Sequence, residues 1–161
     1  MNCQSSLSSI PYQSEVKLAV RFSDVDMMRV VHHAAYLHFF ETMRFALLRN
    51  FLRVEIERFF SAQVVCPVVD CQVKYLRSVT FGQEPIGYVR LWLLKNSSFA
   101  FDYWIAVGRE ICARGRTRHC FATAELELLL HPPEFFRNAI HVAREQYPDL
   151  IVEASTLEGL R

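Results

Sequence analysis

The sequence predicts an α+β domain in which one long helix precedes an antiparallel sheet. Residues 34–52 carry apolar side chains every three or four positions, which is the spacing of an amphipathic helix. Most of residues 64–130 is β-rich and is interrupted by short turns near residues 82–85, 95–98 and 108–110. Strands joined by such short turns pair antiparallel, so the later part of the chain is expected to form the sheet.

The first strand is expected over residues 16–23, where apolar and mostly polar side chains alternate with a period of two. A loop from Asp24 to about residue 33 leads into the long helix. The apolar stripe of this helix consists of Tyr36, Phe40, Met43, Leu47 and Phe51. Residues 53–63 are expected to be a connector with room for a second short helix.

The sheet strands are expected over residues 64–76, 86–94, 98–107 and 111–130. Pro67 indicates an irregular or edge position in the first of these strands. The dipeptide Pro132-Pro133 stops the last one. Pro133 and Glu134 suit the first turn of a closing helix, which Pro148 ends.

The 161 residues suit one domain, expected over residues 14–148 with flexible termini at 1–13 and 149–161. The chain is 52% hydrophobic, which is rich for a small domain and indicates burial between subunits. Its net charge of +1 argues against a nucleic-acid partner. No apolar run has membrane-spanning length, so no membrane association is expected.

The cysteines predict a reducing compartment. They show neither a CxxC pair nor the spacing of a zinc site, and they lie in apolar stretches as buried thiols would. These residues are Cys3, Cys66, Cys71, Cys112 and Cys120. The N-terminus has no basic region followed by an apolar one, as a signal peptide would, so a cytoplasmic location is expected.

The most informative stretch is VRFSDVDMMRVVHHAAYLHFFE, residues 20–41. It places the carboxylate of Asp26 close in sequence to the free backbone amides of a helix start near residues 33–35. A carboxylate beside such donors suits acyl-transfer chemistry. The residues alone equally allow Asp26 to bond only loop amides in an Asx-turn. Asp24 is expected to be a structural residue that caps backbone amides.

This stretch resembles the opening motif of hotdog-fold thioesterases of the 4-hydroxybenzoyl-CoA type. The matching positions are Phe22, Asp24, Asp26, Val31, His33, Ala34, Ala35, Tyr36, Phe40 and Glu41. Residues 68–82, 98–107 and 113–121 resemble later strands of the same family. The chain departs from the family pattern at Met27-Met28-Arg29 and at Ala35, where the family usually has a small or Gly-containing loop and an Asn.

The resemblance implies a hotdog fold, in which an antiparallel sheet wraps around one long central helix. It implies hydrolysis of an acyl-CoA or carrier-protein thioester, with no metal and no organic cofactor. Asp26 would be the nucleophile or general base, and the backbone amide of His33 would polarise the thioester carbonyl. The protein would be a homodimer or homotetramer, with its sites in clefts between protomers.

Six residues are expected to bind the substrate. They are Val31, Tyr36, Phe40, Arg77, Arg116 and Thr117. Tyr36 and Phe40 would contact the acyl or aryl group, and Arg77 and Arg116 would face the phosphates of the thiol carrier. Arg114, Arg116 and Arg118 alternate along one strand face, which suits an acidic carrier protein equally well.

Two other functions stay open at this point. A His33/Glu41 pair resembles the one that hotdog dehydratases use on 3-hydroxyacyl thioesters. Glu41 could instead form an ordinary helix ion pair with Arg44 three residues on. A hotdog protein that only binds acyl thioesters is the other alternative. A metal site at His32 and His33 is not expected, because no third ligand has suitable spacing.

Overall fold

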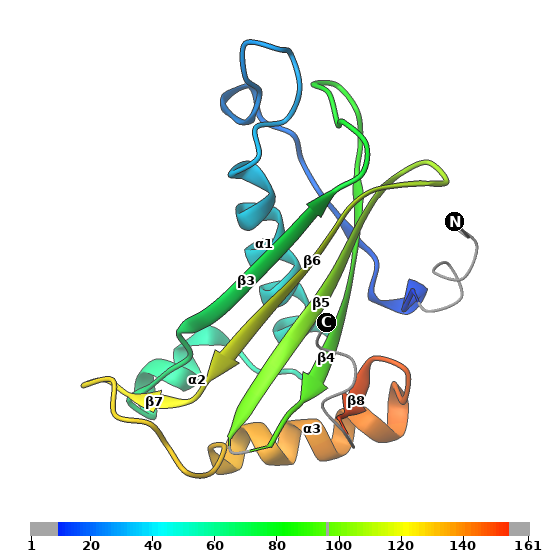
Figure 1. The fold of residues 1–161 in the computed structure, drawn as a ribbon. Helices are drawn as coiled ribbons and strands as arrows, with labels where there is room; N and C mark the ends of the chain where they lie inside the picture. The colour runs from blue at the N-terminus through cyan, green and yellow to red at the C-terminus, as the bar shows by residue number, and fades with distance from the viewer. Residues whose placement is uncertain (1–9, 96, 155–161) are drawn as a thin grey trace.

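Figure 1 shows the computed structural model of the protein, which describes residues 10–95 and 97–154. The α-helices are α1 (Ala35–Asn50), α2 (Ile56–Ser61) and α3 (Glu134–Gln146). Short 3-10 helices are η2 (Tyr12–Ser14) and η3 (Phe22–Asp24). The strands are β1 (Val16–Lys17), β2 (Val64–Val65), β3 (Val68–Tyr75), β4 (Ile86–Leu93), β5 (Ser98–Val107), β6 (Glu110–Cys120), β7 (Ala122–Thr123) and β8 (Ile151–Glu153).

The main sheet has the order β1-β4-β5-β6-β3, and every neighbouring pair on this path is antiparallel. Strand β8 adds to β4 in parallel, and β2 pairs with β7 in a separate ribbon. The α1 helix lies on one face of the sheet, and α3 crosses the end where β4 gives way to β5 (Figure 1). This arrangement confirms the predicted α+β fold and leaves β3 at an edge.

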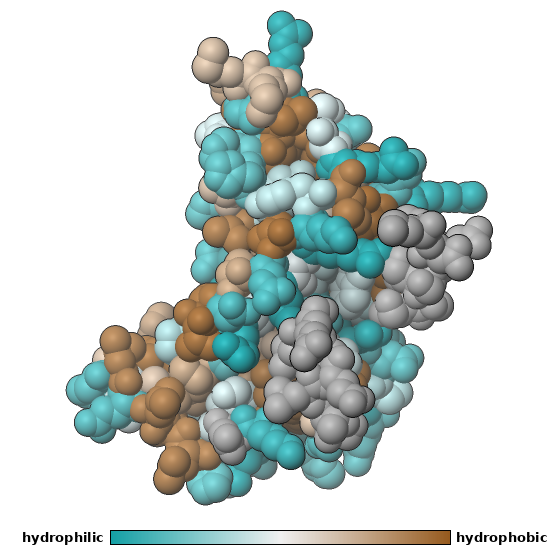
Figure 2. Space-filling model, viewed as in Figure 1, coloured by the Kyte–Doolittle hydropathy of each residue, from teal (hydrophilic) through white to brown (hydrophobic). Residues whose placement is uncertain are grey.

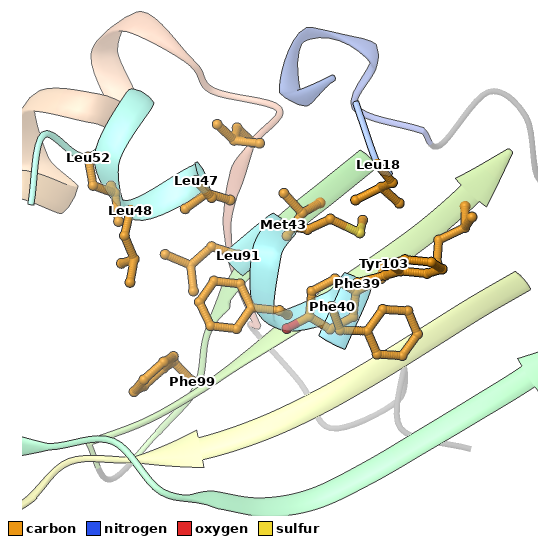
Figure 3. Close-up of a cluster of buried hydrophobic side chains, with 14 of the residues drawn as sticks. Leu18, Phe39, Phe40, Met43, Leu47, Leu48, Leu52, Leu91, Phe99 and Tyr103 are labelled. Atoms are coloured by element: carbon orange, nitrogen blue, oxygen red, sulfur yellow. The ribbon is translucent and has the colours of Figure 1, made fainter. Parts of the chain in front are cut away.

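The core lies between α1 and the sheet. Figure 3 shows the helix side chains Phe40, Met43 and Leu47 pointing toward Leu91 and Tyr103 of the strands, and all five are buried. The helix approaches the sheet at glycines. A Cβ atom at Gly115 of β6 would lie 2.2 Å from the ring of Phe40. The predicted apolar stripe of the helix is therefore the surface that fills the core.

The first strand is much shorter than expected. Only Val16 and Lys17 pair with β4, and the chain then leaves the sheet for η3, although strand was expected to residue 23. The backbone amide of Arg21 donates to Asp24 Oδ2 at 2.8 Å instead of to a neighbouring strand. A local side-chain acceptor therefore replaces sheet pairing here.

The last strand is also shorter than the expected residues 111–130. β6 ends at Cys120 and β7 ends at Thr123, and the chain then turns back on itself so that Leu129 N donates to Phe121 O at 2.9 Å. The Thr123 hydroxyl accepts from the amides of Glu125 and Glu127, both at 3.3 Å. Leu126 has φ of 67°, a left-handed conformation that a continuous strand does not contain.

Strand β8 lies beyond the domain boundary expected at residue 148. Ile151 pairs with Leu91, and the amide of Leu91 donates to Leu150 O at 2.9 Å. At the other end, Tyr12–Ser14 is a 3-10 helix, and the buried Ser14 hydroxyl accepts from Val89 N at 2.8 Å. The rest of the two predicted flexible termini, residues 1–9 and 155–161, lies outside the described residues.

Four of the five cysteines are described, and all four are free thiols. Cys112 is buried and Cys66 and Cys120 are half-buried, as expected, whereas Cys71 is exposed because it lies on the edge strand β3. Cys3 lies outside the described residues.

A short chain of polar groups crosses the core beneath β5 and β6. The hydroxyls of Tyr103 and Thr117 are 2.8 Å apart, and His119 Nε2 is 2.9 Å from the same Thr117 hydroxyl. The His119 ring stacks on Phe99 and is almost completely buried. Burial, and secondarily the positive charge of Arg44, lowers the pKa of His119 to about 4. His119 is therefore neutral in the folded protein near neutral pH.

We expect His119 to make the protein less stable in mild acid. Between its ordinary pKa of 6.5 and about 4, the unfolded chain binds a proton that the folded protein does not. The free energy of unfolding therefore falls as pH falls through this window, by about 3 kcal/mol in all. Urea unfolding near neutral pH and near the lower end of the window, for wild type and His119→Gln, measures the effect.

The variant should lose this part of the pH dependence whatever its stability at neutral pH. His131→Gln is the matched control, because it removes an exposed histidine and leaves the buried His119 in place. Equal pH slopes in wild type and His119→Gln would contradict the assignment.

Candidate active site

The loop between η3 and α1 is closed at its base by backbone and side-chain hydrogen bonds. His32 N donates to Asp24 O at 2.7 Å, and Val31 N donates to Val79 O at 2.7 Å. The Asp24 carboxylate accepts from Arg21 N, as described above. Its predicted role as a structural capping residue is confirmed.

The two carboxylate oxygens of Asp26 have different surroundings. Its Oδ1 accepts from Met28 N at 2.8 Å and lies 3.5 Å from Val30 N, so the Asx-turn alternative is present. Within the described part of the chain, Oδ2 receives no hydrogen bond. Arg29, at the tip of the turn, has φ of 63°. One oxygen therefore shapes the loop, and the other is available to a ligand.

The start of α1 offers an unused donor. Tyr75 Oη donates to His33 O at 3.1 Å, and Ala34 N donates to His32 Nδ1 at 3.2 Å. Ala35 N donates to His32 O at 2.9 Å. The amide of His33 has no such acceptor among residues 10–95 and 97–154. It lies at the positive end of the helix dipole, where a negative charge is stabilised.

A cleft of about 320 Å³ lies at this end of the molecule, next to the end of β3. It is lined by Asp26, Met28, Val30, Val31, His33, Tyr36, Tyr75, Leu76, Arg77 and Ser78. Five of the eight predicted site residues meet here. They are Asp26, Val31, His33, Tyr36 and Arg77.

Tyr75 is a cleft residue that was not among the predicted site residues. Besides its bond to His33, its ring packs edge-to-face on Tyr36 with centroids 5.1 Å apart. Burial raises the pKa of both phenols, so both are neutral near neutral pH. The signal was present in the sequence, since Tyr75 immediately precedes Leu76 and Arg77 in a segment that resembled the family.

Three predicted substrate-binding residues do not line the cleft. Phe40 is buried and stacks on Tyr103, with centroids 4.3 Å apart. Thr117 is buried in the polar chain described above. Arg116 lies on the opposite face of the sheet, where its Nη2 donates to Asp102 Oδ2 at 2.6 Å. The placement does not support their expected contacts with substrate, because core packing or an ion pair already engages each side chain.

No group of three His, Cys, Asp or Glu side chains that could hold a metal occurs within residues 10–95 and 97–154. Over the same residues, no helix is both long and apolar enough to cross a bilayer.

Comparison with known proteins identifies the family. The family described as "Thioesterase-like superfamily" matches residues 20–140, so the chain belongs to this superfamily. The resemblance noted in the opening motif is thereby confirmed, and the expected class of thioester hydrolases is confirmed at the level of the family.

Individual relatives agree with this assignment. The chain is 30% identical over 92 residues to the Bacillus subtilis (strain 168) protein named "Putative acyl-CoA thioesterase YneP". That match covers 56% of this chain and 63% of YneP, which is less than two thirds of its length. The structure of TT1821 from Thermus thermophilus, called a hypothetical protein, superimposes with a TM-score of 0.73 and 26% identity. It covers 80% of this chain and 98% of TT1821.

The fold is also shared with Slr0204, a 1,4-dihydroxy-2-naphthoyl-CoA thioesterase from Synechocystis. The TM-score is 0.71 at 18% identity, over 79% of this chain and 94% of the other. The predicted hotdog architecture is therefore that of a solved thioesterase.

Proposed function

We propose that this protein hydrolyses acyl-CoA thioesters, with Asp26 as the catalytic carboxylate. The observation that carries the proposal is the pairing of two unused groups in one cleft. These are the free Oδ2 of Asp26 and the free amide of His33 at the start of α1. The relationship to YneP supports a CoA thioester as the substrate class.

The chemistry follows from these two groups. Asp26 either attacks the thioester carbon directly or removes a proton from a water that attacks it. The carbonyl oxygen becomes an oxyanion, and the His33 N–H and the helix dipole stabilise it. The carbon–sulfur bond then breaks, and the thiolate of CoA leaves and takes up a proton. In the nucleophilic route, water subsequently hydrolyses the acyl-Asp26 anhydride.

The cleft lining suggests how the substrate is held. Val31 and Tyr36 provide apolar surface beside the carboxylate for the acyl group. Arg77 is exposed at the rim and pairs with Glu110 at 3.1 Å. An ion pair this exposed is weak, so a CoA phosphate can compete for Arg77.

The dehydratase alternative has less support. Its acid would be Glu41, but this side chain is half exposed, lies 3.6 Å from Arg44 and does not line the cleft. Glu41 therefore forms the helix ion pair with Arg44 that the sequence allows.

We also propose that the protein is a homodimer joined through the open edge of β3. This strand ends the sheet, and its apolar side chains Val68, Val69 and Tyr75 are each about half exposed. Figure 2 shows further hydrophobic surface over β7 and the segment after it, where Leu126, Leu128 and Leu130 are exposed. Unpaired backbone groups beside exposed apolar side chains favour pairing with a second copy.

Sedimentation velocity over a range of protein concentrations tests the assembly. We expect twice the mass of the 18.8 kDa chain. Val69→Lys places a charge on the edge strand and should shift the equilibrium toward monomer, whereas a monomer at all concentrations in wild type would contradict the proposal.

Release of free thiol from a panel of alkyl- and aryl-CoA thioesters tests the hydrolysis. The same acyl groups on a carrier protein form the second arm. Turnover on the CoA esters supports the proposal, and turnover on the carrier esters alone moves the substrate class to carrier proteins. Retention of unchanged ester in both arms would instead identify a binding protein.

A further inference from the structure

The most unusual charged group outside the cleft is Arg44, in the middle of α1. Its side chain is only 15% exposed. Its polar contacts are long: Nη1 lies 3.5 Å from Tyr103 Oη, and Nη2 lies 3.6 Å from Glu41 Oε1. A guanidinium has five N–H donors, and a buried one normally makes short, charge-assisted bonds near 2.8 Å.

Arg116 shows the usual arrangement in the same protein. It is similarly buried, and its fork binds both carboxylate oxygens of Asp102. Arg44 has no comparable carboxylate among residues 10–95 and 97–154. A desolvated cation without a close acceptor is energetically costly. Arg44 is therefore a candidate to bind an acceptor from outside the chain.

Other polar groups lie beside Arg44. Its neighbour Tyr103 Oη is hydrogen-bonded to the Thr117 hydroxyl. The two hydroxyls and the guanidinium lie between α1 and the sheet, and the positive charge of Arg44 also acts on the Cys71 thiol of β3. They form a polar end to a region otherwise made of aromatic and aliphatic side chains.

This polar end lies in line with the catalytic cleft. Tyr36 lines the cleft, and Arg44 lies eight residues further along α1, about 12 Å in axial rise. Long helix side chains lean toward the N-terminus, which brings the guanidinium closer to the cleft.

The facing side of β3 is open over the same span. Tyr75 of the cleft and Cys71 both lie on the helix-facing side of β3, because they pair with Ala113 and Thr117 of β6. Cys71 is exposed and Tyr75 is 49% exposed, so α1 does not cover this strip. The strand β3 is therefore exposed on its helix-facing side at Tyr75, which lines the cleft, and at Cys71, further along the same strand.

We propose that Arg44, with the Tyr103 hydroxyl, binds a carboxylate at the far end of the acyl group. The preferred substrate is then a medium-chain acyl thioester that ends in a carboxylate, the half-thioester of a dicarboxylic acid. This inference rests on the proposed hydrolysis. A carboxylate matches the planar fork of arginine and would supply the short bonds that Arg44 lacks.

The test compares suberoyl-CoA with octanoyl-CoA, which differ only in a terminal carboxylate against a methyl group. Wild type should have the higher kcat/KM for suberoyl-CoA. In Arg44→Met the suberoyl-to-octanoyl ratio of kcat/KM should fall by roughly 10- to 100-fold, the worth of a charged hydrogen bond. Arg44→Lys should keep part of the preference, since it retains the charge and loses the fork.

Arg49→Met is the matched control. Arg49 lies on the same helix, is exposed and pairs with Glu55, so its loss should leave the ratio unchanged. Thermal melts confirm that each variant is folded.

Two outcomes would overturn the inference. An unchanged ratio in Arg44→Met shows that Arg44 does not contact the acyl end. If the ratio is unchanged and the dimer dissociates, Arg44 pairs instead with a carboxylate of the second copy. If no thioester is hydrolysed, the proposed function fails separately. Calorimetric binding of suberoyl-CoA to Asp26→Asn, with and without Arg44→Met, then decides the inference, and equal affinities reject it.

Discussion

Asp26→Asn is expected to lower kcat for thioester hydrolysis by roughly a hundredfold or more. Asparagine has nearly the same shape, and its side-chain oxygen can still accept from Met28 N, so the Asx-turn should persist. The negative charge and the basic oxygen at Oδ2 are lost, and neither attack on the carbon nor activation of water can proceed. The readout is free-thiol release at saturating substrate for the best CoA ester of the panel.

Asp70→Asn is the matched control, because Asp70 lies on the outer face of β3, where it pairs with Arg118 in register. Its activity should equal that of wild type. Residual activity of Asp26→Asn above about a tenth of wild type would exclude Asp26 as the catalytic carboxylate. Glu41→Gln would then be the next variant, since Glu41 is the acid of the dehydratase alternative.

Gly115→Ala is expected to be among the most destabilising single substitutions in this protein. The added methyl group would lie 2.2 Å from the Phe40 ring, far inside van der Waals contact. The ring cannot move aside easily, because it is 1% exposed and stacks on Tyr103. Overpacking of this kind costs about 1 to 3 kcal/mol or more, and Phe40→Ala costs about 3 to 5 kcal/mol by leaving a cavity.

Gly115→Ala and Phe40→Leu should compensate each other. In Gly115→Ala/Phe40→Leu the smaller side chain makes room for the methyl group. We therefore expect the double variant to be more stable than the sum of the two single effects, with a coupling of about 1 kcal/mol or more. Urea unfolding of the four proteins in the cycle measures this. Strict additivity would mean that the helix does not approach the sheet at Gly115.

Much of this fold could be predicted because its elements are long and periodic. The stripe of α1 matched a core-facing helix surface, and the ends of β4 and β5 were found within one residue. The errors came from segments shaped by single side chains. Asp24 diverts the chain after β1, and Thr123 turns it back after β7. Apolar alternation continues through both segments, so periodicity alone could not show where pairing stops.

The site was predicted best where its residues are near neighbours in sequence. Asp26, Val31, His33 and Tyr36 lie on one loop and the first turn of one helix, so a local motif defines them. Tyr75 enters from a strand 42 residues away from His33, and only the folded chain brings the two together. Phe40 and Thr117 do not line the cleft for a related reason. Phe40 lies on the helix whose first turn lines the cleft, and Thr117 lies on the strand beside β3, but the side chain of each faces the core.

The different roles of the two carboxylate oxygens of Asp26 have an evolutionary consequence. Loop shape depends on Asp24 and on Oδ1, whereas in the proposed mechanism turnover depends on Oδ2. An Asp-to-Asn change requires one nucleotide and preserves the first function while removing the second. A lineage carrying this scaffold can therefore pass from an enzyme to a receptor for the same acyl group in one mutational step, with the folded architecture left intact.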